Sequence, residues 1–534
     1  DLGVRDVRRR EHLERLHLRR VDVAARRRRE VGHRRRRREY VGMECGESTV
    51  LASVLPCTGG WETAACPDAF VLLIFIMKRR SFLMKSSAAA FGFQVVGSHV
   101  LKAAKGGNTP NGKIRIAAIG VGGRGGANLG AMAGEEIVAL CDVDDRRAAH
   151  SFKKFPKAKR FRDFRKMYDQ MGDQIDAVLV ATPDHTHAVQ IMGAIGRGKH
   201  VYSEKPLAHS VAEVRTLQKA AMEKGVITQV GNQGHSSEHI RLFCEMVWAG
   251  AIGNVSEIHC GCDAFKNVYC QIDKQKAIQT EEHEVPEGLD WDLWLGPAAD
   301  RAYNPAYLPF NWRGFSAFGS GCIGDWVCHV VDPSYWAFDL GMPIAVTADT
   351  KGYDPKKHSE FYPKGCRITY EFPAKGERGP VKLVWYDGDY SIPQPDELTA
   401  EKRKVVGTGA VVIGDQGKIM HGSHGAGGCR IIPESKMREF GKPNKSIPRI
   451  KGSHQSDWLN AIRAGKEAGS PFSYGGALSE IGLLGMIAIQ RTWGSKGGDR
   501  TGLRLEWDSE KMKFTNDDEA NKLVNPPYRT GWKL

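Results

Sequence analysis

The sequence predicts an α/β domain with a doubly wound parallel sheet, followed by an α+β domain with a large open antiparallel sheet. From residue 113 to about residue 230, short apolar runs alternate with helical segments. Such alternation requires right-handed crossovers and gives a parallel sheet. Beyond residue 345, runs such as CRITYEF and VKLVWYD alternate as antiparallel strands do. We therefore assign the first domain to residues 105–234 and the second to residues 235–534.

The strongest local pattern lies in residues 113–144, KIRIAAIGVGGRGGANLGAMAGEEIVALCDVD. An apolar run over 114–119 predicts a buried strand, small residues over 126–133 predict a helix, and 137–141 predicts a second strand. A G-x-G-x-x-G turn joins the first strand to the helix, and an aspartate ends the second strand. This order is that of a dinucleotide-binding Rossmann unit, whereas a lone glycine motif would also suit a plain turn.

Each residue of this turn has a separate task in binding a dinucleotide. Gly120 permits a tight turn, Gly122 lets the backbone approach a pyrophosphate, and Gly125 lets the helix pack on the strand. Asp142 is placed to accept hydrogen bonds from ribose hydroxyls and to disfavour a 2′-phosphate, so NAD is expected and NADP is the alternative. Gly123 and Arg124, inside the turn, complete the predicted contacts of the cofactor with this segment.

Polar clusters follow the next predicted strands of the parallel sheet. PDHTH follows a strand over 175–182, EKP follows a strand over 200–203, and GNQGH follows a strand over 226–230. Ligands of doubly wound sheets bind beyond the carboxyl ends of the strands. The further predicted cofactor-binding residues are therefore Thr182, Pro183, His187, Glu204, Lys205 and Asn232.

Periodicity and capping predict the other elements. A short strand is predicted over 159–164, and a helix over 210–224 carries a capping box formed by Ser210 and Glu213. The remaining predictions are helices over 164–171, 188–197, 237–248, 324–336, 453–464 and 476–490, and a strand over 255–262.

Two sets of residues are candidates for chemistry. Lys205 at a strand end could donate to a substrate hydroxyl or a ribose, or be an ordinary surface lysine before a proline. Asp325, His329 and Asp332 fall on one helical face at i, i+4 and i+7, and a histidine suits acid–base chemistry at an alcohol. The alternative to a catalytic role is that Asp325 caps the helix and His329 packs in the core. A zinc site is a further alternative, but it would need a third ligand that the spacing does not supply. Pro333 predicts a kink.

Together these segments resemble the glucose–fructose oxidoreductase / inositol dehydrogenase (Gfo/Idh/MocA) family over residues 113–490. The motifs, in order, are IAAIGVGGRG, VALCDVD, VATPDHTH, SEKPLA, GNQGH, GDWVCHVVD and HQSDWLNAIRAGK. The resemblance implies a Rossmann domain, an open-faced sheet domain, NAD(P) between them and a homo-oligomer formed through the sheet. It also implies that Lys205, Asp325 and His329 are catalytic, with His329 accepting a hydroxyl proton as hydride moves to nicotinamide.

The resemblance implies an oxidoreductase acting on a sugar or cyclitol CH–OH group. Two alternatives share the scaffold: a glycoside hydrolase that uses NAD for transient oxidation, and a non-catalytic sugar- or cofactor-binding protein. The presence of both Lys205 and His329 weighs against the non-catalytic alternative.

The net charge of +15 does not predict a nucleic-acid-binding surface. Residues 1–76 hold 16 Arg, no Lys and 11 acidic residues, and residues 77–104 add five basic residues and no acid, which leaves only +5 for the rest. Residues 1–76 are interpreted either as a disordered basic arm or as sequence upstream of a true start at Met77. No metal site is expected, because the 12 cysteines have neither disulfide-framework nor zinc spacing.

The segment from Met77, with KRRSFLMK followed by a small-residue apolar stretch over 86–101, resembles a bacterial twin-arginine export signal. We therefore expect a periplasmic or secreted protein. No other stretch is long and apolar enough to span a bilayer. Stable membrane insertion is accordingly not expected.

Overall fold

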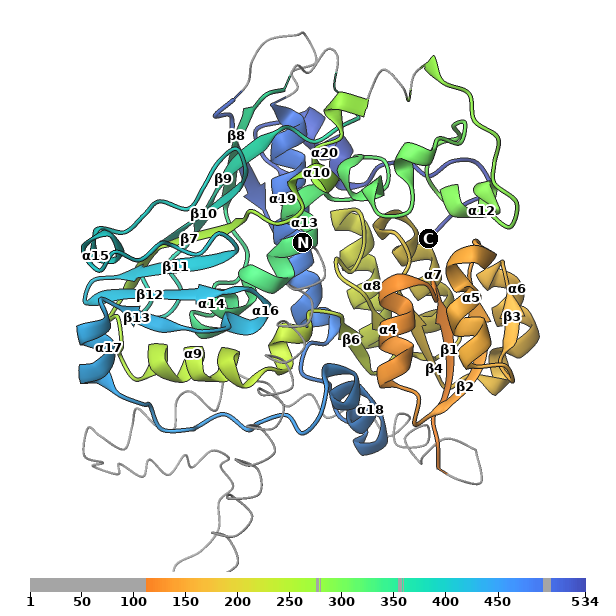
Figure 1. The fold of residues 1–534 in the computed structure, drawn as a ribbon, viewed down its shortest axis with the longest axis horizontal. Coiled ribbons are helices and arrows are strands. Elements are labelled where there is room, and N and C mark those ends of the chain that lie inside the picture. The colour runs from red at the N-terminus through yellow and green to blue at the C-terminus, as the bar shows by residue number, and fades with distance from the viewer. Residues whose placement is uncertain (1–111, 275–277, 279, 354–357, 359, 493–500) are drawn as a thin grey trace, which may run out of the picture. The chain divides into compact units, whose positions relative to one another are not determined.

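The computed structural model describes residues 112–534, except 275–277, 279, 354–357, 359 and 493–500 (Figure 1). The predicted leader over 1–76 and the twin-arginine segment over 77–104 lie outside these described residues. The two predicted sheets are both present.

The first sheet has six parallel strands in the order β3-β2-β1-β4-β5-β6, which confirms the predicted Rossmann domain. The strands are β1 (Arg115–Ile119), β2 (Glu136–Cys141), β3 (Lys159–Phe161), β4 (Ala177–Val180), β5 (His200–Ser203) and β6 (Thr228–Val230). The strand order reverses between β1 and β4. A ligand of such a sheet binds beyond the carboxyl ends of these two strands.

The helices of this sheet are α4 (Gly123–Ala131), α5 (Asp145–Lys154), α6 (Phe164–Met171), α7 (Asp184–Gly196) and α8 (Val211–Lys224). Two begin earlier than predicted: α4 starts inside the glycine turn, and α7 starts directly after Pro183. The prediction omitted α5, because its many charged residues hide the apolar face formed by Ala148 and Phe152. The capping box of Ser210 and Glu213 at α8 is confirmed.

The second sheet has nine strands in the order β13-β12-β11-β7-β10-β9-β8-β14-β15. The strands are β7 (Val255–Cys262), β8 (Ala345–Lys351), β9 (Gly365–Phe372), β10 (Val381–Gly388), β11 (Gly409–Gly414), β12 (Gly417–Gly422), β13 (Arg430–Ile432), β14 (Arg504–Asp508) and β15 (Lys513–Phe514). The predicted all-antiparallel pairing needs one correction, because β7 and β10 run parallel. More than a hundred residues separate these two strands, which is ample for a crossover.

Helices cover one side of the second sheet, where Figure 1 shows α9, α13, α14 and α19. The remaining helices and turns are α9 (Glu238–Trp248), α10 (Lys266–Tyr269), α12 (Trp291–Leu295), α13 (Gly321–Val330), α14 (Asp332–Ala337), α15 (Asp396–Ala400), α16 (Ser423–Ala426), α17 (Glu434–Phe440), α18 (His454–Ala464), α19 (Phe472–Arg491), α20 (Asp518–Val524) and short 3₁₀ turns. The single helix predicted over 324–336 is two helices. Pro333 stands in the first turn of the second, where its missing N–H costs nothing.

Helix α19 corrects the prediction that no stretch is long and apolar enough to span a bilayer. By length and composition alone α19 could span one, yet 83% of its most apolar 18-residue window is buried inside the protein. It packs against α8, α13 and β8. Gly482 and Gly485 allow the close approach, since a Cβ on Gly485 would lie 2.1 Å from the Tyr370 hydroxyl.

Candidate active site

The glycine turn has the geometry that a dinucleotide requires. Gly120 has φ of 76°, and a Cβ there would lie 2.6 Å from the Ala181 carbonyl oxygen. A Cβ on Gly125 would lie 1.8 Å from the Gly120 carbonyl oxygen, so only glycine lets α4 start this close to β1. No side chain caps the start of α4. Its first N–H groups and the helix dipole therefore favour a phosphate.

A cavity of about 260 Å³ opens beside this turn. Its lining includes seven of the predicted cofactor residues: Gly120, Gly122, Gly123, Arg124, Asp142, Thr182 and Pro183. Sequence reasoning missed its other wall, which contains Trp294, Phe310, Trp312, Arg313 and Trp532. Trp294 lies on α12 (Trp291–Leu295), the residues from Phe310 to Arg313 lie at a 3₁₀ turn over Asn311–Gly314, and Trp532 lies among the last residues of the sequence. No periodic pattern marks them.

Asp142 braces the glycine turn as well as facing the cavity. One carboxylate oxygen accepts from the Val121 and Gly122 backbone N–H groups at 2.8 and 3.3 Å, and the other accepts from the Asp144 N–H at 3.0 Å. Burial raises the pKa of Asp142, although these three hydrogen bonds oppose the rise. A carboxylate has about four acceptor positions, so it can also bind ribose hydroxyls.

Two other predicted cofactor residues, His187 and Glu204, do not line this cavity but form hydrogen bonds that hold neighbouring segments together. Both ring nitrogens of buried His187 lie 2.8 Å from carbonyl oxygens, those of Pro206 and Thr182. The Glu204 carboxylate accepts from Asn128 of α4 at 2.8 Å and from Gln233 at 2.9 Å. Glu204 therefore ties the GNQGH segment to the helix that starts at the glycine turn.

Lys205 and Asp325 form a buried ion pair between the two domains. Asp325 also accepts from the Tyr269 hydroxyl, and the Arg313 Nε lies 3.3 Å from its second oxygen. Burial alone would raise the pKa of Asp325, but the Lys205 ammonium and the Arg313 guanidinium outweigh it and hold that pKa well below its usual range. The carboxylate is therefore ionised and forms an ion pair with Lys205.

His329 lies beside this pair, and its ring stacks on that of His424 with centroids 4.0 Å apart. Burial, then the Lys205 ammonium and His424, hold the pKa of His329 well below the usual value. Its Nδ1 atom is buried and has no hydrogen-bond partner among the described residues. His329 is thus a neutral imidazole, which is the protonation state in which the ring can accept a proton.

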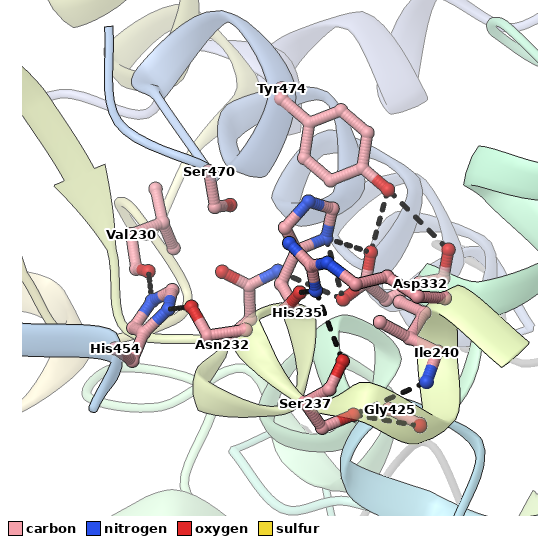
Figure 2. A network of polar contacts seen from close by, with 12 residues as sticks. Val230, Asn232, His235, Ser237, Ile240, Asp332, Gly425, His454, Ser470 and Tyr474 are labelled. Carbon is pink, nitrogen blue, oxygen red and sulfur yellow. Dashed lines mark hydrogen bonds and ion pairs between the residues drawn. The ribbon is translucent and has the colours of Figure 1, made fainter. Parts of the chain in front are cut away.

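Asn232 belongs to a buried network around Asp332, shown in Figure 2. The Asp332 carboxylate accepts from the Tyr474 hydroxyl at 2.6 Å and from Asn232 at 3.1 Å, and it lies 3.0 Å from His235 Nδ1. The His235 ring stacks on Trp336. Through these contacts Asp332, on α14, is tied to the segment after β6 and to α19. Its carboxylate therefore does not join Asp325 and His329, with which it was predicted to share a helical face.

The cavity and the ionised groups meet at Arg313, which lines the cavity and pairs with Asp325. The arrangement offers a dinucleotide cradle, a fixed cation at Lys205 and a neutral base at His329. No group of three His, Cys, Asp or Glu side chains in the described part of the chain has the geometry to hold a metal ion.

Models of one protein family match the first sheet domain and part of the second. The model described as the Gfo/Idh/MocA oxidoreductase family, NAD-binding Rossmann fold, matches residues 114–232, and its C-terminal alpha/beta domain matches residues 260–377.

Two curated relatives are similar to parts of the chain. A levoglucosan dehydrogenase of Pseudarthrobacter phenanthrenivorans is 26% identical over 219 residues, which are 41% of this chain and 46% of that protein. Inositol 2-dehydrogenase 3 of Saccharopolyspora erythraea is 33% identical over 188 residues, 34% of this chain and 53% of that protein. The chain thus spans about half the length of these relatives.

Among solved structures, an aldose-aldose oxidoreductase from Caulobacter crescentus, complexed with glycerol, is 16% identical. The match covers 74% of this chain and all of that one, with a TM-score of 0.46.

Proposed function

We propose that this chain is an oxidoreductase of the Gfo/Idh/MocA family that transfers hydride between a CH–OH carbon of a sugar or cyclitol and nicotinamide. Models of that family match residues 114–232 and 260–377, which supports the proposal. The observation that carries this proposal is the neutral His329 next to the Lys205–Asp325 ion pair, beside a cavity built on the glycine turn. The names of the dehydrogenase relatives agree with this class of substrate.

The cofactor would be held by the residues of the glycine turn. The N-terminus of α4 suits the pyrophosphate, and Asp142 suits a ribose diol. When bound, nicotinamide accepts or gives the hydride. The tight packing at Gly120 and Gly125 is the feature of this chain that fits a dinucleotide, because a side chain at either position would collide with the backbone and force the turn apart.

The protein's own residues would handle the proton and the charge. His329 accepts the proton of the substrate hydroxyl as the carbon loses hydride. The Lys205 ammonium stabilises the negative charge that develops on that oxygen. Asp325 keeps the ammonium in place, and its own charge is neutralised in part by Arg313. In the reverse direction the protonated His329 returns the proton.

Two measurements test this proposal. Mass spectrometry of the small molecules released from purified, denatured protein should detect NAD or NADP. NADH formation at 340 nm should follow when sugars and cyclitols are offered to the protein with NAD. Binding of NAD without oxidation of any sugar or cyclitol would contradict the oxidoreductase. Release of 4-nitrophenol from a 4-nitrophenyl glycoside without added NAD would assign the site to the glycoside hydrolase.

We also propose that residues 77–104 direct export by the twin-arginine route and that copies of the chain associate through the second sheet. The export proposal rests on the sequence around Arg79 and Arg80. Expression from Met77 followed by cell fractionation tests it: unchanged periplasmic yield after Arg79→Lys with Arg80→Lys would contradict export. Mass photometry of the purified protein tests association, and a purely monomeric species would contradict it.

A further inference from the structure

Three aromatic side chains gather at the outer edge of the site; we call Phe265, Phe310 and Trp326 the aromatic rim. Phe265 is 55% exposed and Phe310 is 41% exposed, which places both among the most exposed large apolar residues of the described chain. Their ring centroids are 5.8 Å apart, and that of Trp326 is 6.2 Å from Phe265. Clustered exposed apolar rings commonly mark a binding surface.

The aromatic rim is directly connected to the candidate catalytic residues. Trp326 follows Asp325 in α13, and its indole N–H donates to the Tyr269 hydroxyl at 2.7 Å. That hydroxyl in turn donates to Asp325. Phe310 lines the nucleotide cavity, and the Arg313 guanidinium lies 4.1 Å from the centre of the Phe310 ring. A molecule held at His329 and Lys205 therefore has the aromatic rim next to it.

Two residues at the aromatic rim have a strained backbone conformation. Phe265 has φ of 55°, in the left-handed region that bulky residues rarely adopt. His424, whose ring lies edge-on to Trp326 with centroids 5.5 Å apart, has φ of 54°. These are two of only six non-glycine residues with positive φ in the described chain. Strained backbone of this kind tends to collect at functional sites.

We propose that the aromatic rim is a second sugar subsite, so that the substrate is a glycoside of at least two rings, of which the inner one is oxidised. This inference rests on the proposed function. A pyranose presents C–H bonds on its faces, and these fit the electron-rich face of an aromatic ring. Arg313 and His424 border the aromatic rim and can bind hydroxyls at the edge of the outer sugar ring. A purely apolar ligand would make no use of these two polar side chains.

The test compares matched sugars: glucose with cellobiose and maltose, and galactose with lactose and melibiose. We expect the best disaccharide to have a kcat/KM roughly tenfold or more above that of its monosaccharide. Phe265→Gly removes one ring and also relieves the positive φ, so folding should be retained. We expect this variant and Phe310→Ala each to reduce the disaccharide-to-monosaccharide ratio by roughly 3- to 10-fold. Met222→Ala, at a 65% exposed residue elsewhere, should leave the ratio unchanged.

Two results would contradict the proposed subsite. One is an equal kcat/KM for disaccharide and monosaccharide; the other is an equal loss of kcat/KM on both sugars in Phe265→Gly and Phe310→Ala. A preference for 4-nitrophenyl β-D-glucoside over cellobiose that Phe265→Gly removes would assign the aromatic rim to an apolar aglycone. Dissociation of an oligomer by Phe265→Gly, seen by mass photometry, would assign it to a second copy of the chain.

A calorimetric measurement separates this inference from the proposed function. If no sugar is oxidised, the proposed function fails, and titration of the same sugars into the NAD-loaded protein then decides the subsite. Tighter binding of a disaccharide, lost in Phe265→Gly, would support it; equal binding of both sugars would contradict it.

Discussion

Lys205 and Asp325 stand 120 positions apart in the chain and form an ion pair in which their side chains are only 11% and 9% exposed. Lys205 follows β5 of the parallel sheet, and Asp325 lies on α13 of the second domain. The contact between the two domains therefore brings together the two charged side chains of the candidate active site.

Asp325→Asn should destabilise the protein, because it leaves the buried Lys205 ammonium without its counter-charge. Breaking a buried pair costs about 3–5 kcal/mol, whereas Asp339→Asn, which removes the exposed partner of Lys375, should cost less than about 1 kcal/mol. Urea unfolding at pH 7 measures both losses.

The effect of Asp325→Asn should also depend on pH in a defined direction. The folded pKa of Asp325 is depressed, so the stability it supplies is complete above its unfolded pKa of about 3.9 and is lost as the pH falls toward the folded value. The gap between wild type and Asp325→Asn should thus narrow below about pH 4. A gap that stays constant from pH 7 to pH 3 would show that the carboxylate is not ionised in the pair.

Gly125→Ala should abolish NAD binding and lower stability. Its Cβ would lie 1.8 Å from the Gly120 carbonyl oxygen, so β1 and α4 would have to separate. Gly134→Ala is the matched control in the same domain, since a Cβ there meets nothing within 4 Å. Fluorescence titration with NAD and thermal unfolding of both variants check this. Wild-type NAD affinity in Gly125→Ala would contradict the role given to the turn.

The parallel sheet was predicted in detail because most of its strands are short buried apolar runs and helices separate them along the chain. The alternation of strand and helix fixed their connection. The parallel pairing of β7 and β10 was not predictable, because partners so distant in sequence leave no periodic trace. The helix α5 was missed because many of its residues are charged, whereas the apolar run of α19 predicted a helix over 476–490, which the structure confirms.

Tyr474→Phe and Asp332→Ala should differ in their effects on stability. The first removes one hydrogen bond to Asp332 and should cost about 1–3 kcal/mol. The second leaves Asn232, His235 and Tyr474 without their shared acceptor and should cost about 3–5 kcal/mol. Chemical unfolding of both variants measures this, and an equal small loss would show that the network contributes little.

NAD should bind at least about tenfold more tightly than NADP, because the Asp142 carboxylate repels a 2′-phosphate. Arg124 and Arg147, which also line the cavity, act in the opposite direction. Asp142→Ser should narrow the ratio of the two dissociation constants. Fluorescence titration of both cofactors is the measurement, and tighter binding of NADP to the wild type would contradict the assignment.

Much of the candidate site was visible in the sequence because motifs sit at strand ends. Seven of the predicted cofactor residues line one cavity, and Lys205, Asp325 and His329 lie together. Tyr269, Arg313 and His424 were missed. They reach the site from loops and short helices whose positions depend on tertiary packing, and single residues of this kind carry no spacing signal.

Lys205 and His329 should act as one unit in catalysis. Each alanine variant should lower kcat by about 10²- to 10⁴-fold, as loss of general acid–base catalysis does. Because both serve one proton transfer, the double variant should fall well short of the combined losses. Steady-state kinetics of the three variants test this, and fully additive losses would indicate independent roles.

The central claim, that His329 accepts the hydroxyl proton, is tested most directly by the pH dependence of kcat/KM in wild type and His329→Ala. A base works only when deprotonated, so wild-type activity should fall on acidification; the depressed pKa of His329 places that fall below the usual histidine value of about 6.5. His329→Ala should lose this acidic limb together with most of kcat, while its NAD affinity changes far less. His239→Ala, at an exposed histidine, should match the wild type. Near-full turnover and an unchanged acidic limb in His329→Ala would contradict the assignment.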